Sequence, residues 1–164
     1  MQNMHTDIRS SSPRYRERLS PSLWLLVAAA VGAPMIALVL TPVDRTLALV
    51  AGVAFSAVLI LLLVAFSPSV TIQDGVLRAG RAHIDVDLLG DAVALTGEEA
   101  HAARGPGLDR RSWTLLRGGI DGVVVIPVAD ANDPTPNWVI SSRTPDRLAA
   151  ALRRARTTPR TPGR

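Results

Sequence analysis

The amino-acid sequence predicts a membrane α-helical hairpin followed by one small, mainly β domain. Two apolar runs without a charged residue, Leu23–Leu40 and Leu47–Phe66, are separated only by residues 41–46. Short alternating segments with turn residues between them fill most of the remaining chain, and one amphipathic segment closes it. We therefore divide the 164 residues into a basic N-terminal segment (1–22), a two-helix transmembrane hairpin (23–66), a β-rich domain (68–156) and a tail that we expect to be disordered (157–164).

The two apolar runs have the length of helices that cross a bilayer. At about 1.5 Å rise per residue, each helix would cover roughly the 30 Å hydrocarbon layer. Neither run holds an ionisable side chain, which disfavours a transporter or channel. Small residues recur every four positions, so the two helix backbones can approach closely. These small residues are Ala29, Ala33 and Ala37 in the first run and Ala48, Gly52 and Ser56 in the second.

The charges that flank the hairpin predict its orientation. Three arginines lie between residues 14 and 18, whereas the connecting loop offers only Arg45 beside Asp44. By the positive-inside rule the N-terminus is then cytoplasmic, and two spans return the chain to the same side. The β-rich domain would also be cytoplasmic. The alternative is a signal peptide cleaved after Ala33, although Pro34 directly behind that position disfavours cleavage.

Composition excludes several classes of site. The chain has no cysteine, which rules out a disulfide scaffold, a thiolate metal site and a cysteine nucleophile. All 18 basic residues are arginine, which is typical of a GC-rich bacterial genome. The net charge of +4 is spread along the chain rather than concentrated in one stretch. We therefore expect no nucleic-acid partner.

Seven short segments after the hairpin have the alternation of β-strands. Asp74-Gly75 lies between the first two and is a strong signal for a two-residue hairpin turn. Glu98–Arg104 has helical character and is followed by Gly105-Pro106-Gly107, which must be a loop. The predicted strands are Val70–Gln73, Val76–Ala79, Ala82–Val86, Ala92–Leu95, Ser112–Leu116, Val123–Val128 and Trp138–Ser141.

One clear helix follows the strands. Thr144 is a good N-cap and Pro145 suits the first helical position. The apolar stripe beyond them consists of Leu148, Ala151, Leu152 and Ala155. About seven strands closed by one amphipathic C-terminal helix is the order of a pleckstrin-homology-like domain. There the helix covers one open end of a bent antiparallel sheet, a partly open barrel. An unrelated α+β sandwich is the alternative.

Taken together, these segments resemble a family of small two-pass membrane proteins of actinobacteria, known only as domain-of-unknown-function family 3093. The matching pieces are Tyr15–Leu19, Ser67-Pro68, Asp74–Arg81, Gly105–Gly107, Asp130–Pro136 and Trp138–Leu152. The resemblance covers nearly the whole chain and rests on order and spacing. It implies a bacterial inner-membrane protein, and it brings no activity and no cofactor.

Four arginines of the domain are candidates for contact with a lipid headgroup or phosphate. Arg78 and Arg81 follow the hairpin, and Arg110 and Arg111 follow a glycine-rich loop whose N–H groups could hold an anion. No enzyme signature occurs, so we expect no catalytic, cofactor-binding or metal-binding residue. Asp85 and Asp87, two apart on a predicted strand, are the best acidic pair for acid–base chemistry.

Three functions remain open at this point. The first is a non-enzymatic interaction module, held at the cytoplasmic face by the hairpin, that binds a membrane or cytoplasmic protein. The second is a sensor of anionic lipid or phosphate that uses the four arginines. The third is a membrane-bound enzyme with acidic catalytic residues. A closed barrel without a cavity would favour the first function. Arginines facing the bilayer would favour the second, and clustered Asp and His side chains would favour the third. The oligomeric state is open.

Overall fold

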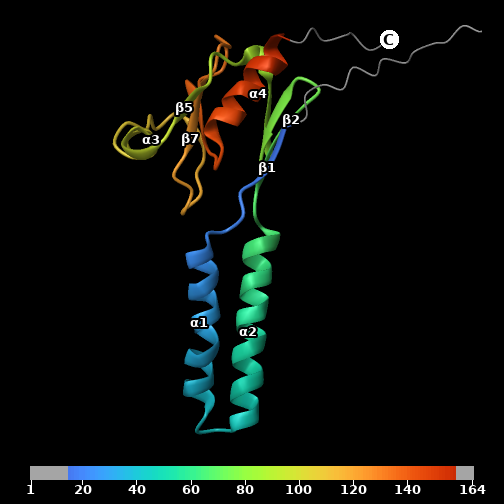
Figure 1. Cartoon of the computed structure of the whole chain (residues 1–164), viewed down its shortest axis with the longest axis vertical. Helices are drawn as coiled ribbons and strands as arrows, with labels where there is room; N and C mark the ends of the chain where they lie inside the picture. The colour runs from blue at the N-terminus through green and yellow to red at the C-terminus, as the bar shows by residue number, and fades with distance from the viewer. Residues whose placement is uncertain (1–14, 158–164) are drawn as a thin grey trace, which may run out of the picture.

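The computed structural model describes residues 15–157 and shows two long helices that project side by side from one end of a β-rich domain (Figure 1). Residues 1–14 and 158–164, which include nearly all of the predicted tail, lie outside the described residues. The helices are α1 (Leu23–Leu40) and α2 (Arg45–Ala65). Both are long and apolar enough to cross a membrane by length and composition, and few of their residues are buried within the protein.

The two helices pack through small side chains. Ala29 of α1 and Ala48, Gly52 and Ser56 of α2 are buried. The Ser56 hydroxyl donates a hydrogen bond of 3.1 Å to the carbonyl oxygen of Ala29. A Cβ atom at Gly52 would overlap the backbone oxygen of Ala33. The helix backbones therefore touch directly, as in helix pairs that meet at small residues.

The first sheet contains the strands on both sides of the hairpin. Its order is β1-β2-β3-β4, and all neighbours are antiparallel. The strands are β1 (Tyr15–Arg18), β2 (Ser69–Gln73), β3 (Val76–Ala79) and β4 (Ala82–Asp85). β1 is not predicted from the sequence, because residues 15–18 lie in the expected basic N-terminal segment. Since β1 precedes α1 and β2 follows α2, the whole hairpin connects two paired strands.

The second sheet has the order β5-β7-β8-β6. Its strands are β5 (Val93–Leu95), β6 (Trp113–Leu115), β7 (Val123–Pro127) and β8 (Asn137–Ser141). A 3-10 turn, η1 (Val86–Leu88), and the helix α3 (Gly97–Arg104) lie outside the sheet. β6 runs parallel to β8, so the expectation of a purely antiparallel bent sheet was wrong. A parallel pair needs a long connection, and β7 with its loops supplies it.

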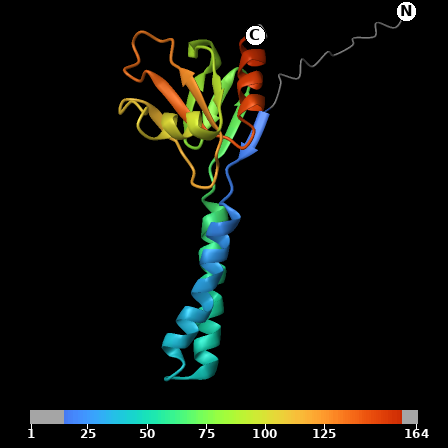
Figure 2. The same ribbon diagram turned by 60° about the vertical axis from the view of Figure 1, so that its left-hand side comes forward.

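Helix α4 (Pro145–Thr157) packs against β2 of the first sheet and β5 and β7 of the second. Leu148, Ala149, Ala151 and Leu152 are its buried apolar side chains, and they join one core with residues of both sheets. The domain thus consists of two β-sheets and a C-terminal helix. The sheets do not form a closed barrel. Figure 2 shows α4 (red) upright beside β1 (blue), with its far end pointing away from the hairpin.

Candidate functional site

Five segments that are distant in sequence meet where the domain joins the hairpin. The N–H of Leu19, before α1, donates to the carbonyl of Pro68, after α2, at 2.9 Å. The β3–β4 turn lies beside them, because the N–H of Gly80 donates to Ser69 at the start of β2. The β6–β7 loop also reaches this end, where Gly119 has a φ of 78° and lies so close to Ser22 that a Cβ would overlap. The fifth segment is the β8–α4 turn. We call this end of the domain the base.

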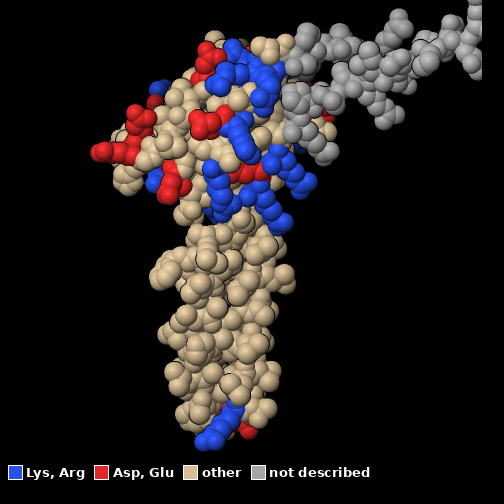
Figure 3. All heavy atoms as spheres, in the orientation of Figure 1, with Lys and Arg blue, Asp and Glu red and all other residues tan. Residues whose placement is uncertain are grey.

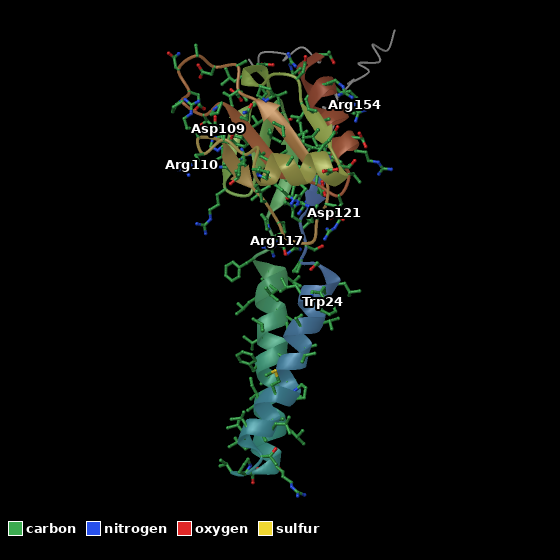
Figure 4. All side chains as sticks on the ribbon, turned by 90° about the vertical axis from the view of Figure 1, so that its left-hand side faces the viewer. Trp24, Asp109, Arg110, Arg117, Asp121 and Arg154 are labelled. Carbon is green, nitrogen blue, oxygen red and sulfur yellow. The ribbon has the colours of Figure 1, made fainter. Side chains whose placement is uncertain are left out.

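Four arginines, one from each of four segments, surround the base, and we call them the basal arginines. They are Arg18 at the end of β1, Arg81 in the β3–β4 turn, Arg117 in the β6–β7 loop and Arg143 in the β8–α4 turn. Figure 3 shows basic side chains gathered at the junction with the apolar hairpin, and Figure 4 places Arg117 directly above the helices. These four arginines are far apart in the sequence, and the fold brings them together.

Hydrogen bonds hold two of the basal arginines in place. Arg18 Nη2 donates to the carbonyl of Val64, in the last turn of α2, at 2.9 Å. Arg143 donates to the backbone oxygen of Ser20 at 2.8 Å and to its hydroxyl at 3.1 Å. These contacts tie the domain to the last turn of α2 and to the segment that precedes α1. Arg81 is exposed and Arg117 is half-buried, and neither guanidinium forms a hydrogen bond or ion pair with any residue of the described range 15–157.

The β6–β7 loop carries Arg117 in a fixed position. The N–H of Arg117 donates to the Ser141 hydroxyl at 3.0 Å, and Arg104 of α3 donates to the carbonyl of Ile120 at 2.8 Å. Ile120 is buried, whereas Leu116, just before Arg117, is exposed. Asp121 is an acidic residue of the same loop, and Figure 4 places it at the base. The loop therefore presents one cation, one anion and one apolar side chain.

Glu17 of β1 links the first sheet to the β8–α4 turn. Its Oε2 accepts hydrogen bonds from the hydroxyls of Tyr15 at 2.7 Å and Ser142 at 2.6 Å. Its Oε1 accepts from the N–H of Arg143 at 2.7 Å. Burial, more than any hydrogen bond, raises the pKa of Tyr15, so this hydroxyl stays protonated and remains a donor at neutral pH. Both oxygens of the Glu17 carboxylate thus accept hydrogen bonds from within the protein.

The structure separates the four arginines selected from the sequence. Arg81 lies at the base, and Arg78 is exposed on β3 opposite Thr71 and His83. Arg110 and Arg111 precede β6, whose other end leads to the base, and Figure 4 shows Arg110 at the side of the domain.

The loop that holds Arg110 and Arg111 contains its own ion pair. The N–H of Arg111 donates to Asp109 at 2.8 Å, and their side chains form an ion pair at 3.5 Å. That backbone hydrogen bond, followed by the guanidinium, lowers the pKa of Asp109. The carboxylate of Asp109 therefore partly balances the charge of this loop.

The acidic pair proposed from the sequence does not share a strand. β4 ends at Asp85, and Asp87 lies in the 3-10 turn η1, because Val86 turns inward and becomes fully buried. Within the described residues, no three His, Asp or Glu side chains gather closely enough to hold a metal ion.

Sequence analysis missed Arg18, Arg117 and Arg143 as members of one site. The alternation of Tyr15-Arg16-Glu17-Arg18 is the signal that could have revealed β1 and the outward position of Arg18. Arg117 and Arg143 follow predicted strands, but the sequence does not say that both strands end on the same side. The parallel pairing of β6 with β8 decides this.

Comparison with known proteins gives one match. A family model described as "Protein of unknown function (DUF3093)" matches residues 14–152. No curated protein and no solved structure matches the chain.

Proposed function

Since this chain belongs to the family of unknown function DUF3093, we propose a function from its own architecture: it is a two-pass membrane anchor that holds a β-rich domain against anionic lipid headgroups. The observation that carries this proposal is the group of basal arginines at the junction between the domain and an exposed, apolar hairpin.

The surface of the hairpin supports insertion in a membrane. Leu38 and Val39 of α1 and Leu49 and Leu61 of α2 are each more than three-fifths exposed, on helices without an interior charge. Water would solvate these side chains poorly, whereas hydrocarbon accepts them. Trp24 and Phe66, both largely exposed, lie at the domain end of the two helices. Aromatic residues favour the interfacial layer of a bilayer, so the base next to them would lie at headgroup depth.

Two arguments support a cytoplasmic domain. Pairing of β1 with β2 keeps the start of α1 and the end of α2 at the same end of the molecule. The arginines gather at that end, while the α1–α2 loop has Arg45 beside Asp44, and the positive-inside rule then assigns the base to the cytoplasm of a bacterial cell. All basic residues are arginine, which agrees with an origin in a bacterium with a GC-rich genome, such as an actinobacterium.

Cysteine labelling tests this orientation cleanly because the chain has no native cysteine. We expect Val43→Cys, in the exposed α1–α2 loop, to react with a membrane-impermeant maleimide in intact spheroplasts. Arg110→Cys, in the domain, should react only after lysis. Labelling of Arg110→Cys in intact spheroplasts, or protection of Val43→Cys until lysis, would contradict the proposed topology.

The lipid contact follows from the position of the basal arginines. An arginine near an anionic membrane surface contributes about 1 kcal/mol, and the attraction fades within a Debye length of roughly 8–10 Å. Among the described cations of the domain, those at the base lie beside the hairpin, where they would be closest to the headgroups. Arg81 and Arg117 are the best candidates, because Arg18 and Arg143 already donate to the protein. Exposed Leu116 would enter the interfacial layer beside Arg117.

A lipid-dependent thermal shift tests the headgroup contact. A ligand that binds only the folded state raises its melting temperature. We expect phosphatidylglycerol, added to the full chain in detergent, to raise the melting temperature more than phosphatidylcholine does. The Arg81→Glu/Arg117→Glu variant should lose most of this difference. Arg110→Glu/Arg153→Glu has the same net charge and should keep it; equal losses in the two variants would contradict a site at the base.

We also propose that the domain is a variant of the pleckstrin-homology-like architecture. Two four-stranded sheets with a C-terminal helix in contact with both of them support this interpretation. The parallel β6–β8 pair is a departure from the simple antiparallel form. A non-enzymatic role agrees with a site made of arginines.

A further inference from the structure

A shallow hollow lies between β1 and α4; it begins at the β8–α4 turn and extends along α4, away from the hairpin. Its volume is about 540 Å³, and Tyr15, Arg16, Glu17, Thr144, Arg147 and Arg154 line it. Three of these six residues are arginines, supplied by a strand and a helix that are more than a hundred residues apart in sequence. The proposed lipid contact at the base does not use them.

The hollow is electropositive because it has three arginines and one acidic residue. That residue, Glu17, accepts three hydrogen bonds, from Tyr15, Ser142 and the Arg143 backbone, so both of its carboxylate oxygens already contact the protein. Arg16 and Arg147 form no ion pair or hydrogen bond with any residue between 15 and 157. Two guanidinium groups therefore line an open hollow without an ion pair inside the described protein.

The arginines of the hollow form a row that rises away from the base. α4 begins beside Gly122 at the base, where the N–H of Ser142 donates a hydrogen bond to the carbonyl of Gly122. Figure 2 shows the far end of α4 at the opposite side of the domain. Arg147 and Arg154 are two helical turns apart, which is about 10 Å along the axis. A flat lipid surface cannot follow a row that climbs away from it, whereas an extended chain with repeated negative charges can.

We propose that this hollow binds an acidic, extended peptide segment of a partner protein. In a strand, alternate side chains point the same way and are about 6.6 Å apart, so alternating Asp or Glu residues would present several carboxylates on one side to the flexible arginine side chains of the hollow. Single-stranded nucleic acid fits less well because it needs exposed aromatic rings for stacking. The only ring here, Tyr15, is half-buried and its hydroxyl is bonded to Glu17.

The chain's own ends do not have the complementary charge. Residues 1–14 and 158–164 together contain four arginines and a single acidic residue, Asp7. We therefore expect the bound segment to belong to another protein.

Binding of a synthetic peptide tests the inference. The probe is a fluorescent peptide of alternating Glu and Ser, and the ligand control replaces every Glu with Gln. We expect saturable binding of the Glu peptide to the full chain in detergent, measured by fluorescence anisotropy, and no binding of the Gln peptide. Arg16→Glu/Arg147→Glu should weaken binding at least tenfold. Arg110→Glu/Arg153→Glu has the same net charge but alters exposed sites outside the hollow, and should change affinity less than twofold.

Several results would overturn the inference. They are no saturable binding, equal losses in the two charge-reversed variants, and displacement of the peptide by a single-stranded oligonucleotide or by phosphatidylglycerol micelles at lower concentration than by unlabelled peptide. Circular dichroism of each variant separates loss of the site from loss of the fold. The thermal shift at the base depends on Arg81 and Arg117, so the lipid proposal and the peptide proposal can fail independently.

Discussion

Replacing Gly52 with leucine is expected to force the two helices of the hairpin apart. The Cβ atom of any other residue at this position would overlap the backbone oxygen of Ala33. Because the clash is with the main chain, no change of side-chain rotamer can relieve it. Added bulk in a packed interface typically costs about 1–3 kcal/mol. Separation would also weaken the hydrogen bond between Ser56 and Ala29, one turn further along the same contact.

Disulfide formation measures this separation directly. The contacts Ala29–Ser56 and Ala33–Gly52 define a register in which Ala37 faces Ala48. In the cysteine-free chain, an Ala37→Cys/Ala48→Cys pair should oxidise rapidly, and Gly52→Leu should slow this reaction strongly. Ala54→Leu introduces the same leucine side chain at an exposed position of α2 and is the control. Equal oxidation rates in the two leucine variants would show that close packing at Gly52 is not required.

Leu152→Asp is expected to unfold the β-rich domain. The Leu152 side chain is 2% exposed and lies in the core shared by α4 and both sheets. Loss of a buried leucine alone costs about 2–5 kcal/mol, and an unpaired carboxylate in the same place costs more. A domain of this size has only about 5–15 kcal/mol of stability in total. Since α4 touches both sheets, its release would expose the apolar faces of both.

The matched control is Arg153→Asp, which introduces the same side chain one residue further along the helix at an exposed position. We expect it to retain the native circular dichroism spectrum and resistance to limited proteolysis, while Leu152→Asp loses both. The full chain must be used, because a fragment that begins after the hairpin would lack β1, an edge strand of the first sheet. Similar behaviour of the two variants would show that α4 does not support the core.

Local patterns in the sequence were sufficient for most of the secondary structure. The turn at Asp74-Gly75 predicted the β2–β3 hairpin, and the stripe of Leu148 and Leu152 predicted the buried face of α4. β1 was missed because its four residues include two arginines and lie directly before an apolar helix, so charge hid the alternation. Its pairing with β2 depends on residues beyond the hairpin, and no local signal records it.

The candidate site was harder to predict from the sequence, because it too depends on contacts between distant segments. The turn of Gly80 and Arg81 could be recognised locally, and Arg81 does lie at the base. Arg117 and Arg143 reach the base only because β6 and β8 run parallel, so that the loops after both strands emerge at one end. Strand direction is a property of the assembled sheet, and the spacing of apolar residues within one strand does not encode it.

The pairing of β1 with β2 has a consequence for how this protein is made. In the proposed membrane arrangement, α1 and α2 must both insert before the strand in front of them can pair with the strand behind them. During synthesis, β1 would then stay unpaired while the helices insert, and the first sheet would be completed only after the second helix has crossed back. A chain whose second helix fails to insert would leave an edge of β2 unpaired. Completion of the first sheet would thus depend on the insertion of both helices.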